Sequence, residues 1–287
     1  MSAQHSFTTL ITVEELALRI DRCVVVDCRH ALTDASAGRT AYREAHIPGA
    51  VFLHQDEDLA GPHGPGLGRH PLPDRGRLLA RLREAGLHED QQLVAYDADS
   101  GMMAARLWWL ARWLGHRQVA VLDGGLAAWR RAGYPVSGDE PAPAPGDLAE
   151  HASVAPAVDA RRLLDNLSRA ELLVLDARAG ERYRGEVEPL DPVAGHIPGA
   201  INRPQTQNLR PDMTFKPAPV LRAEFEALLG ERPAASIVHS CGSGISACHN
   251  LLAMEYAGLA GSALYPGSWS EWVADGSRPV ATGPLPG

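Results

Sequence analysis

Cysteine is scarce in this sequence. Its 287 residues contain four cysteines, at positions 23, 28, 241 and 248. Thiols so few and so unevenly placed exclude the disulfide framework of a small secreted scaffold. Neither pair has the CxxC spacing and no histidine cluster adjoins them, so a structural zinc site is not expected. We therefore predict reduced thiols, with no metal and no cofactor.

Long apolar runs and an excess of positive charge are also lacking. The most apolar helical stretch, residues 102–115, is interrupted by Arg106 and Arg112, and residues 1–16 have neither a basic nor an apolar leader segment. The formal net charge is -8. Nucleic acids and acidic membrane surfaces bind basic faces, so neither is an expected partner. We expect a cytoplasmic protein with no membrane association.

What the sequence does contain is an ordinary globular composition, 45% hydrophobic and 22% charged, in a chain long enough for two domains. It also contains an internal repeat. The segments CVVVDCR (23–29) and YREAHIPGA (42–50) return as LLVLDAR (172–178) and AGHIPGA (194–200). Asp27 then corresponds to Asp176, and Trp129 to Trp272. Two copies of one unit are present.

Strand and helix signals alternate within each copy, which predicts an α/β fold with a mainly parallel central sheet flanked by helices. Strands are expected at 23–27, 92–97 and 118–123, and again at 171–176, 236–240 and 262–266. Helices are expected at 13–20, 78–86 and 103–115, then at 221–230 and 245–258. A proline-rich stretch separates the copies. We predict domains at 1–137 and 157–287 joined by a linker at 138–156.

The segment that carries chemistry is SIVHSCGSGISACHNLLA (236–253), where an apolar strand leads into Cys241, a small-residue loop and a helix. Gly242 and Gly244 allow successive N–H groups to point at one centre, and the helix start adds partial positive charge. Such a loop stabilises a thiolate or persulfide. The alternative, a buried structural cysteine, is common. Ala98 stands at the equivalent position of the first copy, so one half only carries the nucleophile.

A cysteine phosphatase also cradles an oxyanion with a loop, but it ends that loop with an arginine six residues after the cysteine. Here Ala247 occupies that place, which argues against a phosphatase.

The duplicated units, both HIPGA segments, CGSGISA and the closing YPGSWSEW resemble tandem-domain rhodaneses over nearly the whole chain. The resemblance implies a sulfurtransferase that carries sulfane sulfur as a persulfide on Cys241. Loops of the C-R-K-G type suit thiosulfate, whereas C-G-S-G resembles the 3-mercaptopyruvate branch. The loop residues implied to line the substrate site are Gly242, Gly244, Ile245, Ser246 and Ala247.

The resemblance also implies roles for residues outside the loop. Ser243, His70 and Asp56 match a proton relay beside the cysteine, with the Asp56 match resting on HQD where relatives show D-x-D. Arg182 matches an arginine that binds the substrate carboxylate. A second such arginine is replaced by Leu190, for which Arg184 and Arg203 are candidate substitutes. His46 and His196 occur in both copies, so we expect them to shape turns.

Three hypotheses follow. The first is transfer of sulfur from 3-mercaptopyruvate to cyanide, a thiol or a protein thiol. The second is a thiosulfate:cyanide sulfurtransferase, and the third is a persulfide carrier loaded by a protein partner, with little turnover of small molecules.

Overall fold

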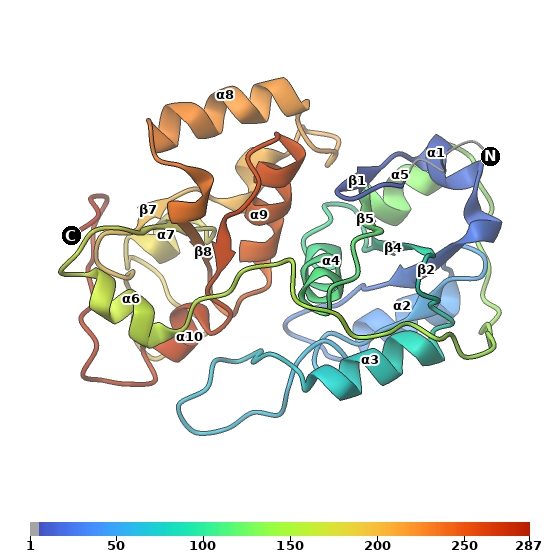
Figure 1. Ribbon diagram of the computed structural model, residues 1–287, viewed down its shortest axis with the longest axis horizontal. Coiled ribbons are helices and arrows are strands. Elements are labelled where there is room, and N and C mark those ends of the chain that lie inside the picture. The colour runs from blue at the N-terminus through green and yellow to red at the C-terminus, as the bar shows by residue number, and fades with distance from the viewer. Residues whose placement is uncertain (1–5) are drawn as a thin grey trace. The chain divides into compact units, whose positions relative to one another are not determined.

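The computed structural model describes residues 6–287, so residues 1–5, which belong to the stretch predicted to lack a leader, lie outside it. The described residues divide into two compact units (Figure 1). The first comprises 6–61, 73–154 and 210–215; the second comprises 62–72, 155–209 and 216–287. The domains predicted from the sequence, 1–137 and 157–287, are each continuous. In the structure residues 62–72 group with the second unit and residues 210–215 with the first, so His70 lies in the same unit as the cysteine loop.

The first unit is a five-stranded, all-parallel sheet with strand order β1-β5-β4-β2-β3. Its elements are β1 (Leu10–Ile11), α1 (Val13–Ala17), β2 (Cys23–Asp27), α2 (Ala37–Glu44), β3 (Val51–Phe52), α3 (Arg75–Glu84), β4 (Gln92–Tyr96), α4 (Ala104–Trp113), β5 (Val119–Leu122) and α5 (Gly125–Arg131). A 3-10 turn, Ile20–Arg22, precedes β2. A capping box is present: Thr12 and Glu15 exchange side-chain-to-backbone bonds at the start of α1.

The second unit repeats this plan with a four-stranded parallel sheet of order β7-β6-β8-β9. Its elements are α6 (Ala160–Asn166), β6 (Leu173–Asp176), α7 (Gly180–Tyr183), β7 (Ile201–Asn202), α8 (Ala218–Leu229), β8 (Ile237–Ser240), α9 (Ser246–Tyr256), β9 (Ala263–Leu264) and α10 (Ser268–Trp272). Two 3-10 turns lie at Gln205–Asn208 and Ala234–Ser236. The predicted α/β class is confirmed.

Both sheets are covered on two faces, which explains their nearly unbroken apolar strands. In β2, Val24, Val25 and Val26 are all buried, although successive side chains point to opposite faces. In the second unit, α9 packs on β8 and β9, and α8 packs on α9. Because β6 and β8 are parallel neighbours, with Asp176 paired in register with Ser240, their carboxyl ends meet at one edge of the second sheet. The cysteine loop starts from this edge.

The two histidines of the HIPGA segments occupy equivalent structural turns. His46 bonds through Nδ1 to the Tyr42 carbonyl at 2.7 Å and stacks on that ring. His196 makes the same bond and stack with Tyr183. Both are fully buried, which supports the prediction of a turn-shaping role. No helix among residues 6–287 is long and apolar enough to span a membrane.

Candidate active site

Cys241 follows β8 directly and is 1% exposed. Gly244 donates its N–H to Cys241 Sγ at 3.2 Å, so the loop turns back on the sulfur. That turn requires glycine, because Gly244 has φ +80° and a Cβ atom there would lie 2.2 Å from the Pro266 carbonyl oxygen. Ile245 precedes α9, and Ser246 and Ala247 begin it. The loop has the predicted strand–loop–helix form.

In the corresponding loop of the first unit, backbone N–H groups converge on a carboxylate. Asp97 follows β4, and its two carboxyl oxygens accept the N–H groups of Asp99, Gly101, Met103 and Ala104 at 2.8–3.3 Å. The loop's backbone thus converges on an oxygen-rich group supplied by its own chain. Burial raises the pKa of Asp97, and this effect outweighs the bonds from the loop amides, which favour the carboxylate. In the second unit the reactive atom offered to the loop is the Cys241 sulfur instead.

Ser268 supports the cysteine from the other side. Its Oγ accepts the Cys241 N–H at 3.1 Å and lies 3.9 Å from Cys241 Sγ. Ser268 has φ +53°, and its counterpart in the first copy is Gly125, also at φ +53°. A side chain is thus held in a backbone conformation that favours glycine, at a position beside the reactive sulfur. Ser268 is not among the residues predicted from the sequence, although the match of YPGSW (265–269) to LDGGL (122–126) places a serine where the first copy has Gly125.

The predicted relay is assembled in part. The Nδ1 atom of His70 and the hydroxyl of Ser243 are 2.8 Å apart, and both residues are buried. They are 173 residues apart in sequence but belong to the same unit. Ser243 is two residues from Cys241, so this hydroxyl–imidazole pair belongs to the loop that carries the sulfur.

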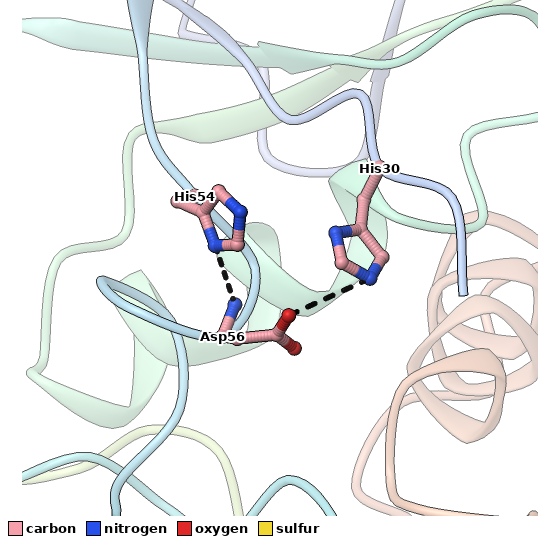
Figure 2. Close-up of side chains that lie close together, drawn as sticks. All are labelled: His30, His54 and Asp56. Carbon is pink, nitrogen blue, oxygen red and sulfur yellow. Dashed lines mark hydrogen bonds and ion pairs between the residues drawn. The ribbon is translucent and has the colours of Figure 1, made fainter. Parts of the chain in front are cut away.

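Asp56, the third member of the predicted relay, belongs to the first unit. Figure 2 shows its surroundings there: Asp56 N–H points to His54 Nδ1 at 3.1 Å, and Asp56 Oδ2 lies 3.8 Å from His30 Nε2. Donor atoms of these three residues lie within 4.8 Å of one another, a spacing that a metal ion would require. However, His54 Nδ1 also accepts the Glu57 N–H, and His54 Nε2 lies 2.8 Å from the Ala35 carbonyl. Backbone groups thus engage both ring nitrogens, so this cluster is not a ready metal site. The relay role of Asp56 stays a prediction.

Arg182 lies in α7 and its guanidinium faces the cysteine loop. A Cβ atom at Gly242 would be 3.5 Å from Arg182 Nη1. Arg182 also bonds to the buried carboxylate of Glu188 at 2.6 Å and to Asp191 at 3.4 Å. Burial raises the pKa of Glu188, but the bond from Arg182 and two backbone N–H bonds outweigh burial, so that pKa is lowered and the pair is ionic.

The other candidate arginines have partners of their own. Arg184 pairs with Glu186 at the surface. Arg203 is bonded to Asn208 and Glu224, and its guanidinium lies over the Phe225 ring. Neither pairing involves the cysteine loop.

Arg178 was not identified from the sequence. It forks onto Asp176 with bonds of 2.6–3.1 Å and donates to the Gly195 carbonyl. Its guanidinium lies 4.8 Å from the Trp269 ring centroid. Burial opposes the charge of Arg178, but the carboxylates of Asp176 and Glu188 and a thiolate at Cys241 favour it, so its pKa is raised. The repeated D-x-R of both copies held the signal, since Arg29 forks onto Asp27 in the same way.

Comparison with known proteins places this geometry in a family. The family model of the rhodanese-like domain matches residues 12–132 and 159–275. The chain is 49% identical over 282 residues, 97% of its length and 99% of the relative's, to a Pseudomonas aeruginosa protein named "Probable 3-mercaptopyruvate sulfurtransferase". It is 33% identical to the thiosulfate sulfurtransferase of Bos taurus, over 82% of this chain and 79% of that one.

Among solved structures, SseA from Escherichia coli, described as a 3-mercaptopyruvate sulfotransferase, is similar with a TM-score of 0.78 and 30% identity. That match covers 92% of this chain and all of the other. The chain belongs to the rhodanese family, in which it carries the domain twice. It is an enzyme, a sulfurtransferase.

Proposed function

We propose that the enzyme moves sulfane sulfur from 3-mercaptopyruvate to a thiol or cyanide through a persulfide on Cys241. One observation carries this: Cys241 is held by a loop amide and by Ser268, with the Ser243–His70 pair two residues away. The Pseudomonas aeruginosa relative supports the choice of donor through its name. The acceptor is a small thiol, cyanide or a protein thiol.

In the first half-reaction the Cys241 thiolate attacks the sulfur of 3-mercaptopyruvate. An S–S bond forms and the C–S bond breaks, with its electron pair passing to carbon as the enolate of pyruvate. The sulfur is oxidised to the sulfane level and the carbon is reduced by the same two electrons. The Ser243–His70 pair takes the proton of the substrate thiol and returns it to the enolate carbon. Asp56 is proposed to orient His70 in this relay.

In the second half-reaction an acceptor thiolate or cyanide attacks the outer sulfur. A new bond to that sulfur forms, the S–S bond breaks, and Cys241 leaves as the thiolate that the loop stabilises. The proposed contacts to the substrate come from the N–H groups of residues 242–247 and from the Arg182 guanidinium, which suits a carboxylate.

The decisive test combines product assays with intact mass. Wild-type protein should form pyruvate from 3-mercaptopyruvate and gain 32 Da on Cys241, about the mass of one sulfur, when no acceptor is present. Cys241→Ser should lose both, and Cys248→Ser, which removes the other thiol of this unit, should keep both. Full pyruvate formation by Cys241→Ser would refute the mechanism. If the protein forms thiocyanate from thiosulfate and cyanide but no pyruvate from 3-mercaptopyruvate, the donor is thiosulfate. If the protein gains the mass of one sulfur only when a desulfurase is present, it is a persulfide carrier loaded by a protein partner.

A further inference from the structure

Arg69 brings a second guanidinium to the cysteine loop. A Cβ atom at Gly242 would lie 2.8 Å from Arg69 Nη2, closer than from either terminal nitrogen of Arg182. Gly242 directly follows Cys241, so two cationic side chains stand over the residue next to the reactive sulfur. One comes from α7 and the other from the 62–72 segment of the same unit.

The position of Arg69 is built into the fold. Arg69 N–H donates to Ser270 Oγ at 3.0 Å, and Ser270 N–H donates to the Gly242 carbonyl at 2.9 Å. Gly68 packs against the same turn, where a Cβ atom would be 2.6 Å from the Gly267 carbonyl. One serine thus fixes both the Arg69 backbone and the loop.

The Arg69 side chain is oriented as well. Its Nη1 pairs with Asp191, whose side chain is 3% exposed and also bonds to Arg182. Asp191 therefore links the two arginines, and the Nη2 of Arg69 is the atom beside Gly242. Arg69 and Leu190 also line one surface hollow of about 270 Å³. A cation is thus present next to the residue that replaces the expected second arginine.

The backbone at position 242 does not itself demand glycine. Gly242 is absent from the residues of positive φ, so an L side chain is conformationally allowed there. What a side chain would meet is the Arg69 guanidinium. The Arg69 guanidinium thus occupies space that a side chain at position 242 would enter.

We propose that Arg69 binds the anionic group of the sulfur donor, a carboxylate or a sulfonate, together with Arg182. This proposal rests on the proposed function for its ligand. Its physical basis is that each guanidinium is held by a carboxylate through some of its nitrogens and turns another terminal nitrogen, Nη2 of Arg69 and Nη1 of Arg182, towards Gly242. A charged N–H donor bonds strongly to an oxyanion. Asp191 is a positioning residue for both.

The first test needs no turnover. Iodoacetate and iodoacetamide alkylate a thiolate in the same way, since the S–C bond forms as iodide leaves, but only iodoacetate carries an anion. Arg69→Ala should lower the iodoacetate rate at Cys241, followed by peptide mass spectrometry, by about ten-fold while changing the iodoacetamide rate less than two-fold. Arg222→Gln removes an exposed arginine of the same unit, paired with Glu226, and should change neither.

The second test exchanges the positions of the cation. Arg69→Ala combined with Gly242→Arg should restore at least half of the iodoacetate preference, whereas Gly242→Arg alone should not exceed wild type because Arg69 obstructs it. In donor assays Arg69→Ala should raise KM about ten-fold with a smaller change in kcat, for 3-mercaptopyruvate, thiosulfate or both. The donor whose KM rises shows whether the site binds a carboxylate, a sulfonate or both.

An unchanged iodoacetate-to-iodoacetamide ratio in Arg69→Ala would overturn the proposal. Equal losses of both rates would also overturn it, since they would show that Arg69 only supports the loop. If the wild-type protein turns over neither donor while the ratio still falls in Arg69→Ala, the anion site stands and the proposed function fails.

Discussion

Replacing Arg178 by methionine should affect both the stability of the second unit and the reactivity of Cys241. Within residues 6–287, Arg178 is the one side chain that bonds to the Asp176 carboxylate, at 2.6–3.1 Å. The side chains of Arg178 and Asp176 are 1% and 5% exposed. Without it the buried carboxylate keeps the N–H of residue 178 at 2.9 Å. Breaking such a pair costs about 3 kcal/mol of unfolding free energy.

The charge of Arg178 also acts on the cysteine, because a thiolate at Cys241 is among the groups that raise the pKa of Arg178. The interaction of two charges is mutual, so the Arg178 guanidinium stabilises negative charge on the Cys241 sulfur. Arg178→Met should therefore slow iodoacetamide alkylation of Cys241 at pH 7, by about ten-fold. Arg178→Lys keeps the charge but not the two-pronged guanidinium, so its rate of Cys241 alkylation should lie between those of the wild type and Arg178→Met.

Arg29→Met is the matched control in the first unit. Arg29 forks onto Asp27 with the same bonds, and its Nη2 donates to the Ala45 carbonyl as Arg178 Nη2 does to Gly195. In Arg29→Met, Asp27 keeps a 2.7 Å bond from the Tyr96 hydroxyl, so the loss of unfolding free energy should be smaller than in Arg178→Met. Alkylation of Cys241 should not change. Equal rates of Cys241 alkylation in Arg178→Met and Arg29→Met would refute the electrostatic role. Thermal unfolding of both variants measures the two losses of stability.

Three further predictions concern the second unit. Gly244→Ala should lower its unfolding free energy by at least about 2 kcal/mol in denaturant titrations, because a Cβ meets the Pro266 carbonyl at φ +80°; Gly199→Ala, with φ +82° and no atom within 4 Å, should cost about 1 kcal/mol, and equal costs would exclude the collision. Ser243→Ala should reduce kcat for 3-mercaptopyruvate about 100-fold while iodoacetamide alkylation is kept; an unchanged kcat would remove the relay. His239 is fully buried, and burial lowers its pKa from 6.5 to about 3. Between pH 6.5 and 3 the unfolded chain therefore binds a proton that the folded chain does not, so the free energy of unfolding falls as the pH falls through that window, by about 5 kcal/mol. His239→Asn should flatten the acid limb of unfolding, and an unchanged acid limb would contradict this assignment.

The sequence alone determined the repeat and the elements nearest the nucleophile. Apolar runs such as 23–27 and 237–240 predicted buried parallel strands because such strands are covered on both faces. Cys241, its glycines and the start of α9 were predicted because they are consecutive, and local backbone geometry follows from local residue types. Short elements such as β1, β7 and α10 were not predicted, since two to five residues carry no periodicity.

Only the tertiary structure decided which distant side chains reach the cysteine. His70 lies next to Ser243 across 173 residues of sequence, and Arg69 lies over Gly242 because its segment packs into the second unit. The D-x-R pattern occurs in both copies of the repeat, and only in the folded second unit does the charge of its arginine, Arg178, favour a thiolate at Cys241. Charge and proton transfer depend on separation in space, and chain packing sets that separation in ways that residue spacing along the sequence does not record.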